Sequence, residues 1–80
     1  MNFGEWIVLK LKEMGKTQAW LLRRVDLSEG SIQRWCNGEE PNLDTVLLIC
    51  GSLARFLGVR PKHIVYQAIK ENPALWRGKR

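Results

Sequence analysis

Few side chains in this 80-residue chain could carry out catalysis or hold a metal. It has one histidine, His63, and two cysteines, Cys36 and Cys50, which lie 14 residues apart without a Cys-x-x-Cys spacing. A structural zinc site needs four ligands, and a disulfide would be unusual in a reducing cytosol. No nucleophile has a base nearby, and there is no glycine-rich phosphate loop. We therefore expect no enzyme activity, no metal and no cofactor, and we interpret both thiols as small apolar core residues.

Glutamine and arginine side chains offer a different chemistry, the recognition of nucleic acid. Gln33 has the amide donor and acceptor that suit adenine, and Arg34 has the donors that suit guanine or a phosphate. Either could equally be solvated helix surface. The formal net charge of +5 favours a polyanionic partner, although a basic surface alone does not establish one. The charge is uneven, with net values of +2 over residues 1–38, −3 over 39–54 and +6 over 55–80.

The apolar residues have helical spacing along the whole chain, and no segment alternates with a period of two. This pattern predicts an all-α domain of five helices, over residues 3–14, 18–25, 29–36, 43–57 and 61–72. The expected N-caps are Asn2, Thr17, Ser28 and Asn42, and Pro61 suits the first position of the fifth helix. A chain this short forms one domain, which we place at residues 1–72, and residues 73–80 form a basic C-terminal tail.

The break between the second and third helices is only three residues long, from Asp26 to Ser28. Two short helices joined by such a turn cross at a steep angle, which is the helix-turn-helix arrangement. In that arrangement the first helix crosses the DNA backbone and the second lies in the major groove. The break therefore predicts a DNA-binding element at the second and third helices.

The residues around this break resemble the Cro/phage-repressor-type (XRE-like) helix-turn-helix family, and the resemblance extends over about residues 3–70. The matching positions are Thr17, Gln18, Leu21, Ser28, Ile32, Trp35, Asn37, Gly38, Pro41 and the segment Leu57-Gly58-Val59. The resemblance implies a five-helix, lambda-repressor-like fold. The chain departs from the family at Asp26, where glycine is usual, and at Glu29–Gly30, where the family usually places base-reading side chains.

The positions in the expected helices and the resemblance together give a set of candidate DNA contacts. Gln18 lies at a helix N-terminus, where backbone N–H groups and the helix dipole favour an anion. Phosphate contacts are expected at Thr17, Gln18, Ser28 and Asn37, although Asn37 also suits a left-handed C-cap. Base contacts are expected opposite the inward Ile32 and Trp35, at Glu29, Ser31, Gln33 and Arg34.

The fifth helix carries more apolar residues than one core-facing stripe requires. Trp20 is expected on the exposed side of the second helix, and Trp76 lies in the tail. Exposed tryptophans usually mark a contact surface. We therefore expect a homodimer, with its interface formed by Ile64, Val65, Ile69 and Trp76. A twofold dimer requires an inverted-repeat DNA site.

These observations lead to a primary hypothesis and an alternative. The primary hypothesis is a sequence-specific transcriptional regulator, a repressor of a phage or mobile element that binds double-stranded DNA as a dimer. The alternative keeps the fold but makes it a protein-interaction module, such as an antirepressor, antitoxin or assembly adaptor.

No apolar stretch approaches the roughly 20 residues that span a bilayer, and the start of the chain lacks the charge order of a signal peptide. The expected location is the cytoplasm of a bacterial host.

Overall fold

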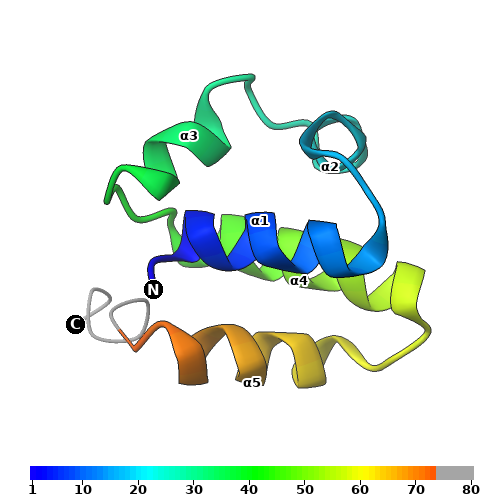
Figure 1. Ribbon diagram of the computed structural model, residues 1–80. Helices are drawn as coiled ribbons and strands as arrows, with labels where there is room; N and C mark the ends of the chain where they lie inside the picture. Colours follow the sequence, from blue (N-terminus) through cyan, green and yellow to red (C-terminus); the bar gives the residue numbers. More distant parts are fainter. Residues whose placement is uncertain (74–80) are drawn as a thin grey trace.

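Five helices make up the part of the chain that the computed structural model describes, residues 1–73 (Figure 1). They are α1 (Phe3–Met14), α2 (Gln18–Val25), α3 (Ser31–Cys36), α4 (Leu43–Leu57) and α5 (Pro61–Glu71). The all-α prediction is confirmed, since these residues contain no strand. The predicted bounds of four helices hold to within one residue, whereas α3 begins two residues later than expected.

Side-chain caps explain where three of the helices begin. Asn2, Thr17 and Asn42 each accept a hydrogen bond from the backbone N–H three residues on, at 2.8, 3.1 and 2.8 Å. Glu5 completes a capping box by accepting from the Asn2 backbone N–H at 3.0 Å. Each cap satisfies an N–H group that has no partner within its helix and stabilises the fold by about 1 kcal/mol.

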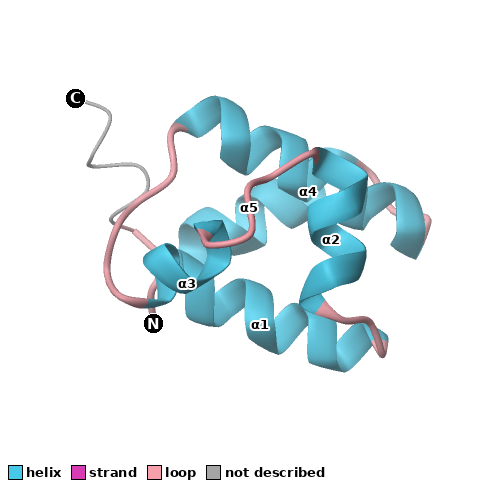
Figure 2. Ribbon diagram, turned by 90° about the horizontal axis from the view of Figure 1, so that it is seen from above, coloured by secondary structure: helices cyan, strands magenta, loops and turns pink. Residues whose placement is uncertain are grey.

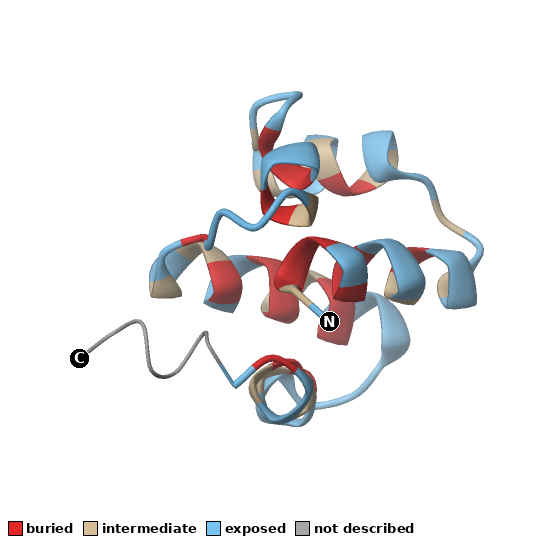
Figure 3. Cartoon of the chain, turned by 60° about the vertical axis from the view of Figure 1, so that its left-hand side comes forward, coloured by how far each residue is buried: buried red, intermediate tan, exposed pale blue. Residues whose placement is uncertain are grey.

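The helices form three layers (Figure 1). Helices α1 and α4 lie in the middle, α2 and α3 cover one side, and α5 covers the other. The inward faces of all five helices are buried, as the colouring of Figure 3 shows. They form one hydrophobic core, of which the largest fully buried side chains are Trp6, Ile7, Leu11, Leu21, Ile32, Ile49, Leu53, Val46 and Cys50.

Trp20 packs within the chain, so its predicted exposure is wrong. The indole makes an edge-to-face contact with Phe56 at 5.2 Å between ring centroids. Arg24 lies 4.9 Å from the Trp20 ring, and Lys16 lies 4.8 Å from the Phe56 ring. The last turn of α4 thus supplies the aromatic partner of a tryptophan on α2.

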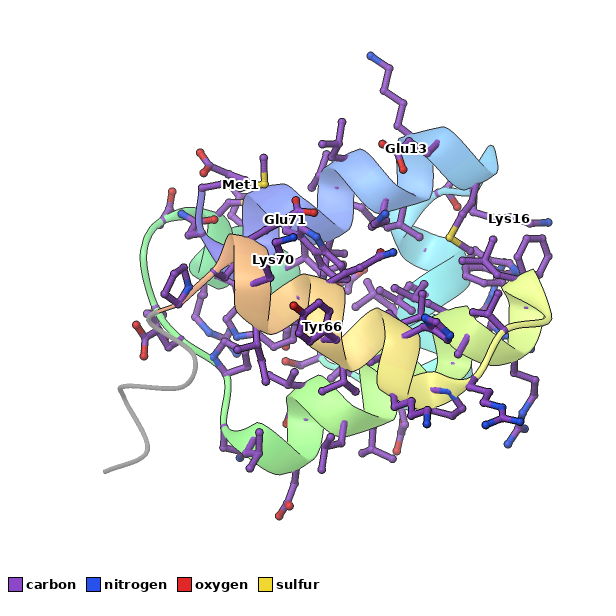
Figure 4. The ribbon with its side chains drawn as sticks, turned by 90° about the horizontal axis from the view of Figure 1, so that it is seen from below. Met1, Glu13, Lys16, Tyr66, Lys70 and Glu71 are labelled. Atoms are coloured by element: carbon purple, nitrogen blue, oxygen red, sulfur yellow. The ribbon has the colours of Figure 1, made fainter. Side chains whose placement is uncertain are left out.

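Helix α5 contributes more to the core than the sequence suggested. Ile64 is only 3% exposed and packs in the core, so its predicted place in a dimer interface is wrong. Val65 and Ile69 are half-buried. Tyr66 is 67% exposed, and Lys70 lies over its ring at 5.9 Å (Figure 4). Trp76 and the rest of the proposed tail from residue 74 lie outside the described residues.

Helices α1 and α3 approach so closely that no side chain fits between them at Gly4. A Cβ on Gly4 would lie 2.2 Å from the Cys36 nitrogen and 2.6 Å from the Trp35 carbonyl carbon. The Asn2 amide Nδ2 also donates to the Cys36 carbonyl oxygen at 2.9 Å. The start of α1 therefore supports the C-terminal end of α3 directly.

Both cysteines are free thiols, and they differ in burial. Cys50 is fully buried, as predicted for a core residue, and burial raises the pKa of its thiol to about 12. Cys36 is only half-buried; desolvation and then the nearby charge of Glu5 raise the pKa of its thiol.

Among residues 1–73, no helix is both long enough and apolar enough to cross a membrane.

Candidate nucleic-acid interface

Helices α2 and α3 form the helix-turn-helix that the sequence predicts. Their axes cross steeply in Figures 1 and 2, and the two helices lie together on the side of the molecule opposite α5. Asp26 begins the turn in the left-handed conformation, with φ 53° and ψ 48°. Among residues 1–73, Asp26 alone has a positive φ without being glycine. It stands where the resembled family usually has glycine. Aspartate tolerates this conformation, so the turn forms without glycine.

The N-terminus of α2 offers groups that bind an anion. Thr17 caps the helix, and Gln18 occupies its first position; both residues are exposed. The first backbone N–H groups of a helix have no partner within the helix and point outward from its positive end. A phosphate oxygen fits such a site, and the Gln18 amide is placed to add a side-chain donor.

The start of α3 differs from the prediction, since Ser28 is not its N-cap. Gly30 occupies the cap position and makes no side-chain cap hydrogen bond. The Ser28 hydroxyl instead lies 2.8 Å from the Ser31 hydroxyl, and the Ser28 carbonyl accepts from the Ser31 backbone N–H at 3.1 Å. Residues 28–31 thus form a tight turn that leads into α3. Ser28 remains exposed, as a phosphate contact requires.

Three of the four predicted base-reading residues are exposed, and the fourth is not. Glu29 lies in the turn before α3, and Gln33 and Arg34 are exposed on the helix. Ser31 is only 5% exposed and is hydrogen-bonded to its neighbours. The prediction that Ser31 projects outward is therefore wrong, because Ser31 lies four residues before the buried Trp35 and shares its face of the helix.

The Arg34 side chain is held by two neighbours. Its Nη2 donates to the Ser31 hydroxyl oxygen at 3.4 Å, and its Nε lies 3.7 Å from a carboxylate oxygen of Glu39. The Arg34 and Glu39 side chains are 51% and 66% exposed, so the ion pair contributes at most about 1 kcal/mol. The sequence reasoning did not identify Glu39. Glu39 follows the helix end at Asn37–Gly38 directly, and this closeness to the last turn of α3 could have indicated a contact with Arg34.

Asn37 ends α3, but not as a left-handed cap. Its φ of −88° and ψ of 7° lie outside the left-handed region, which Gly38 adopts instead with φ 107°. The Asn37 backbone N–H donates to the Gln33 carbonyl at 3.0 Å, and the residue is exposed. The alternative role as a left-handed cap is therefore wrong, and the side chain is accessible for a phosphate.

This geometry defines a class of protein. A five-helix domain of the lambda-repressor type, with its second and third helices in a helix-turn-helix, is a DNA-binding fold. The family model of the Cro/C1-type HTH DNA-binding domain matches residues 6–65, and the chain belongs to this family. No curated protein and no solved structure matches the chain significantly.

Proposed function

We propose that this protein is a sequence-specific transcriptional regulator, a repressor of a phage or mobile element that binds an inverted-repeat operator as a dimer. The observation that carries the proposal is the joint exposure of two sets of groups on neighbouring helices. The N-terminus of α2 presents Thr17 and Gln18 for phosphates, and α3 presents Gln33 and Arg34 for base edges. Such a regulator acts in the cytoplasm of its bacterial host.

In this proposal each contact has a distinct task. Phosphates are bound at Thr17, Gln18, Ser28 and Asn37, which fixes the position of the domain on the duplex without reading sequence. Gln33 and Arg34 read base edges in the major groove, and Glu29 accepts from a cytosine amino group. The proposed domain spans residues 1–72, and the proposed basic tail spans residues 73–80.

Fluorescence anisotropy tests the proposal directly. The protein is titrated onto duplex from the region upstream of its own gene and onto a shuffled duplex, at several salt concentrations. We expect a preference of about a thousandfold or more and a steep loss of affinity with salt. Gln33→Ala should weaken specific binding by about 1–3 kcal/mol if Gln33 reads a base. Equal, weak binding to both duplexes would contradict the proposal.

The dimer contact that we propose uses the outer face of α5. Tyr66 is exposed there, beside the half-buried Val65 and Ile69, and Trp76 follows in the tail. The inverted-repeat operator that we propose for such a twofold pair has half-sites about 34 Å apart, one turn of DNA. Sedimentation velocity tests this arrangement. Tyr66→Glu should give monomers, whereas Lys62→Glu in the exposed first turn of α5 should not. A wild-type chain that stays monomeric at micromolar concentrations would refute the dimer.

A protein-interaction module is the second candidate function, and one surface favours it. A groove of about 690 Å³ lies between α2 and α4, where Leu47 and Leu48 are exposed and Arg24 and Arg55 line the site. These side chains suit a partner segment with both apolar and acidic residues. Binding of such a partner would be sensitive to Leu48→Asp and indifferent to Gln33→Ala, the reverse of the result expected for an operator.

A further inference from the structure

The chain departs from its family at Gly30, and the Arg34 side chain extends over this residue. A Cβ built on Gly30 would lie 3.2 Å from the Arg34 Nη1 atom, closer than ordinary contact. Helical side chains point back towards the N-terminus, so a residue covers the surface about one turn before its own Cα. Arg34 follows Gly30 by four residues and extends over it. The missing side chain at position 30 leaves the space that the guanidinium occupies.

One hydrogen bond and one ion pair contact the guanidinium in this space. Arginine only donates, so the Ser31 oxygen accepts from Arg34 Nη2 at 3.4 Å, and the Ser31 hydrogen is available to the Ser28 oxygen at 2.8 Å. Glu39 approaches a second guanidinium nitrogen, Nε, at 3.7 Å. Ser31 is buried, which fixes its hydroxyl, while the Arg34 side chain remains half-exposed. These contacts favour one orientation of the guanidinium, over the first turn of α3.

The third nitrogen, Nη1, makes no hydrogen bond to any of residues 1–73 and lies over the first turn of α3. In helix-turn-helix proteins this end of the recognition helix contacts the base edges. A guanidinium matches the two acceptors of guanine, O6 and N7, with two parallel hydrogen bonds. An operator guanine would accept from Nη1 and from Nη2, which carries two N–H groups and donates one of them to Ser31.

We infer that Arg34 is the main specificity-determining residue of this domain, and that Gly30 leaves the space in which the Arg34 guanidinium lies. The guanidinium reads a guanine from the place where family members usually carry a base-reading side chain on the helix start. Ser31 is a positioning residue for Arg34. The inference rests on the proposed function, because it names the base that the proposed DNA site must contain in each half-site.

A two-bond contact with guanine requires arginine rather than lysine at position 34. Arg34→Lys keeps the positive charge but has no planar pair of donors, so it loses the bidentate contact. Gly30→Leu keeps Arg34 but fills the space above the first turn of α3. Both variants should therefore lose the same base preference by different means. Arg23→Lys, an exposed site on α2, makes the same chemical change away from α3 and serves as the control.

Selection from a library of random duplexes tests the inference with the full chain. The wild type should enrich a motif with one strongly preferred guanine in each half-site. Arg34→Lys and Gly30→Leu should reduce the preference for that guanine about tenfold to a hundredfold, while the other positions of the motif persist. Arg23→Lys should leave the whole motif unchanged.

The outcomes separate failure of the inference from failure of the proposed function. If the wild type enriches a motif and Arg34→Lys leaves it intact, the inference is overturned and the regulator stands. If only Gly30→Leu leaves the guanine preference intact, the role of Gly30 is overturned. If the wild type enriches no motif at all, the proposed function fails, and the inference fails with it. Circular dichroism of each variant checks that α3 is retained.

Discussion

Gly4→Ala tests whether close contact between α1 and α3 sets the position of the recognition helix. The added Cβ would lie 2.2 Å from the Cys36 nitrogen, where ordinary van der Waals contacts begin at 3.4 Å. The neighbouring atoms belong to the backbone of α3, which cannot rotate away as a side chain can. Helix α3 would therefore have to move by about 1.2 Å, the difference between these two distances.

Two opposing effects determine the expected magnitude. Alanine in a helix interior is more favourable than glycine by about 0.5–1 kcal/mol. Overpacking a well-filled contact typically costs about 1–3 kcal/mol, and a clash with backbone belongs at the upper end of that range. We therefore expect Gly4→Ala to lower the free energy of unfolding by about 2–2.5 kcal/mol and to weaken specific DNA binding as well, because α3 is displaced.

Gly51 provides a matched control for this substitution. It is also a helical glycine, in α4, but a Cβ there would meet nothing within 4 Å. Gly51→Ala should therefore raise the free energy of unfolding by about 0.5–1 kcal/mol, since only the helix propensity changes. Urea denaturation followed by circular dichroism measures both variants. If Gly4→Ala also raised stability, or equalled the wild type, the proposed close contact would be refuted.

Three further predictions concern the turn, an aromatic pair and a buried thiol. Asp26→Gly should raise the free energy of unfolding by about 0.5–1 kcal/mol in urea denaturation, because glycine adopts φ 53° without strain; no gain would contradict this. Phe56→Ala should remove an edge-to-face contact and lower Tm by roughly 4–8 °C, whereas the exposed Leu48→Ala should leave Tm unchanged. The pKa of Cys50 is raised to about 12 by burial, so the folded state binds more protons than the unfolded state above about pH 9. Stability should therefore fall as pH rises from about 9 to 12, by up to about 1.4 kcal/mol per pH unit from this thiol. The slope in urea denaturation should be smaller for Cys50→Ala, and an identical slope would refute the assignment.

Most helix bounds could be predicted because the signals that set them are local. Asn2, Thr17 and Asn42 bond to N–H groups only three residues away, so sequence spacing reveals them. Gly15 and Gly58 adopt the left-handed conformation at helix ends, as expected for C-terminal glycines. The same reasoning failed at Ser28, where a side-chain partner at Ser31 competes with the cap.

The errors in the candidate interfaces have a tertiary cause. Trp20 lies on the polar face of α2, and its side chain is covered by Phe56, which is 36 residues later in the chain. Ile64 was assigned to a dimer because the apolar pattern of α5 does not show how deeply the helix packs. The exposure of Gln33 and Arg34 was predictable, because both lie opposite the apolar face of α3, and Gln18 is exposed because it is the first residue of α2. The contact of Arg34 with Glu39 depends on side-chain conformation and required the structure.

The shortness of α3 has a consequence for how the helix-turn-helix folds. Isolated helices below about 12–15 residues are marginal in water, and α3 has six residues. Its carbonyl at Cys36 is bound by Asn2, 34 residues earlier in the chain, and its backbone packs on Gly4. We therefore expect α3 to form as α1 docks rather than early in folding. Its amides should exchange with solvent only through openings that also release α1, so a peptide limited to residues 17–38 would not retain the helix.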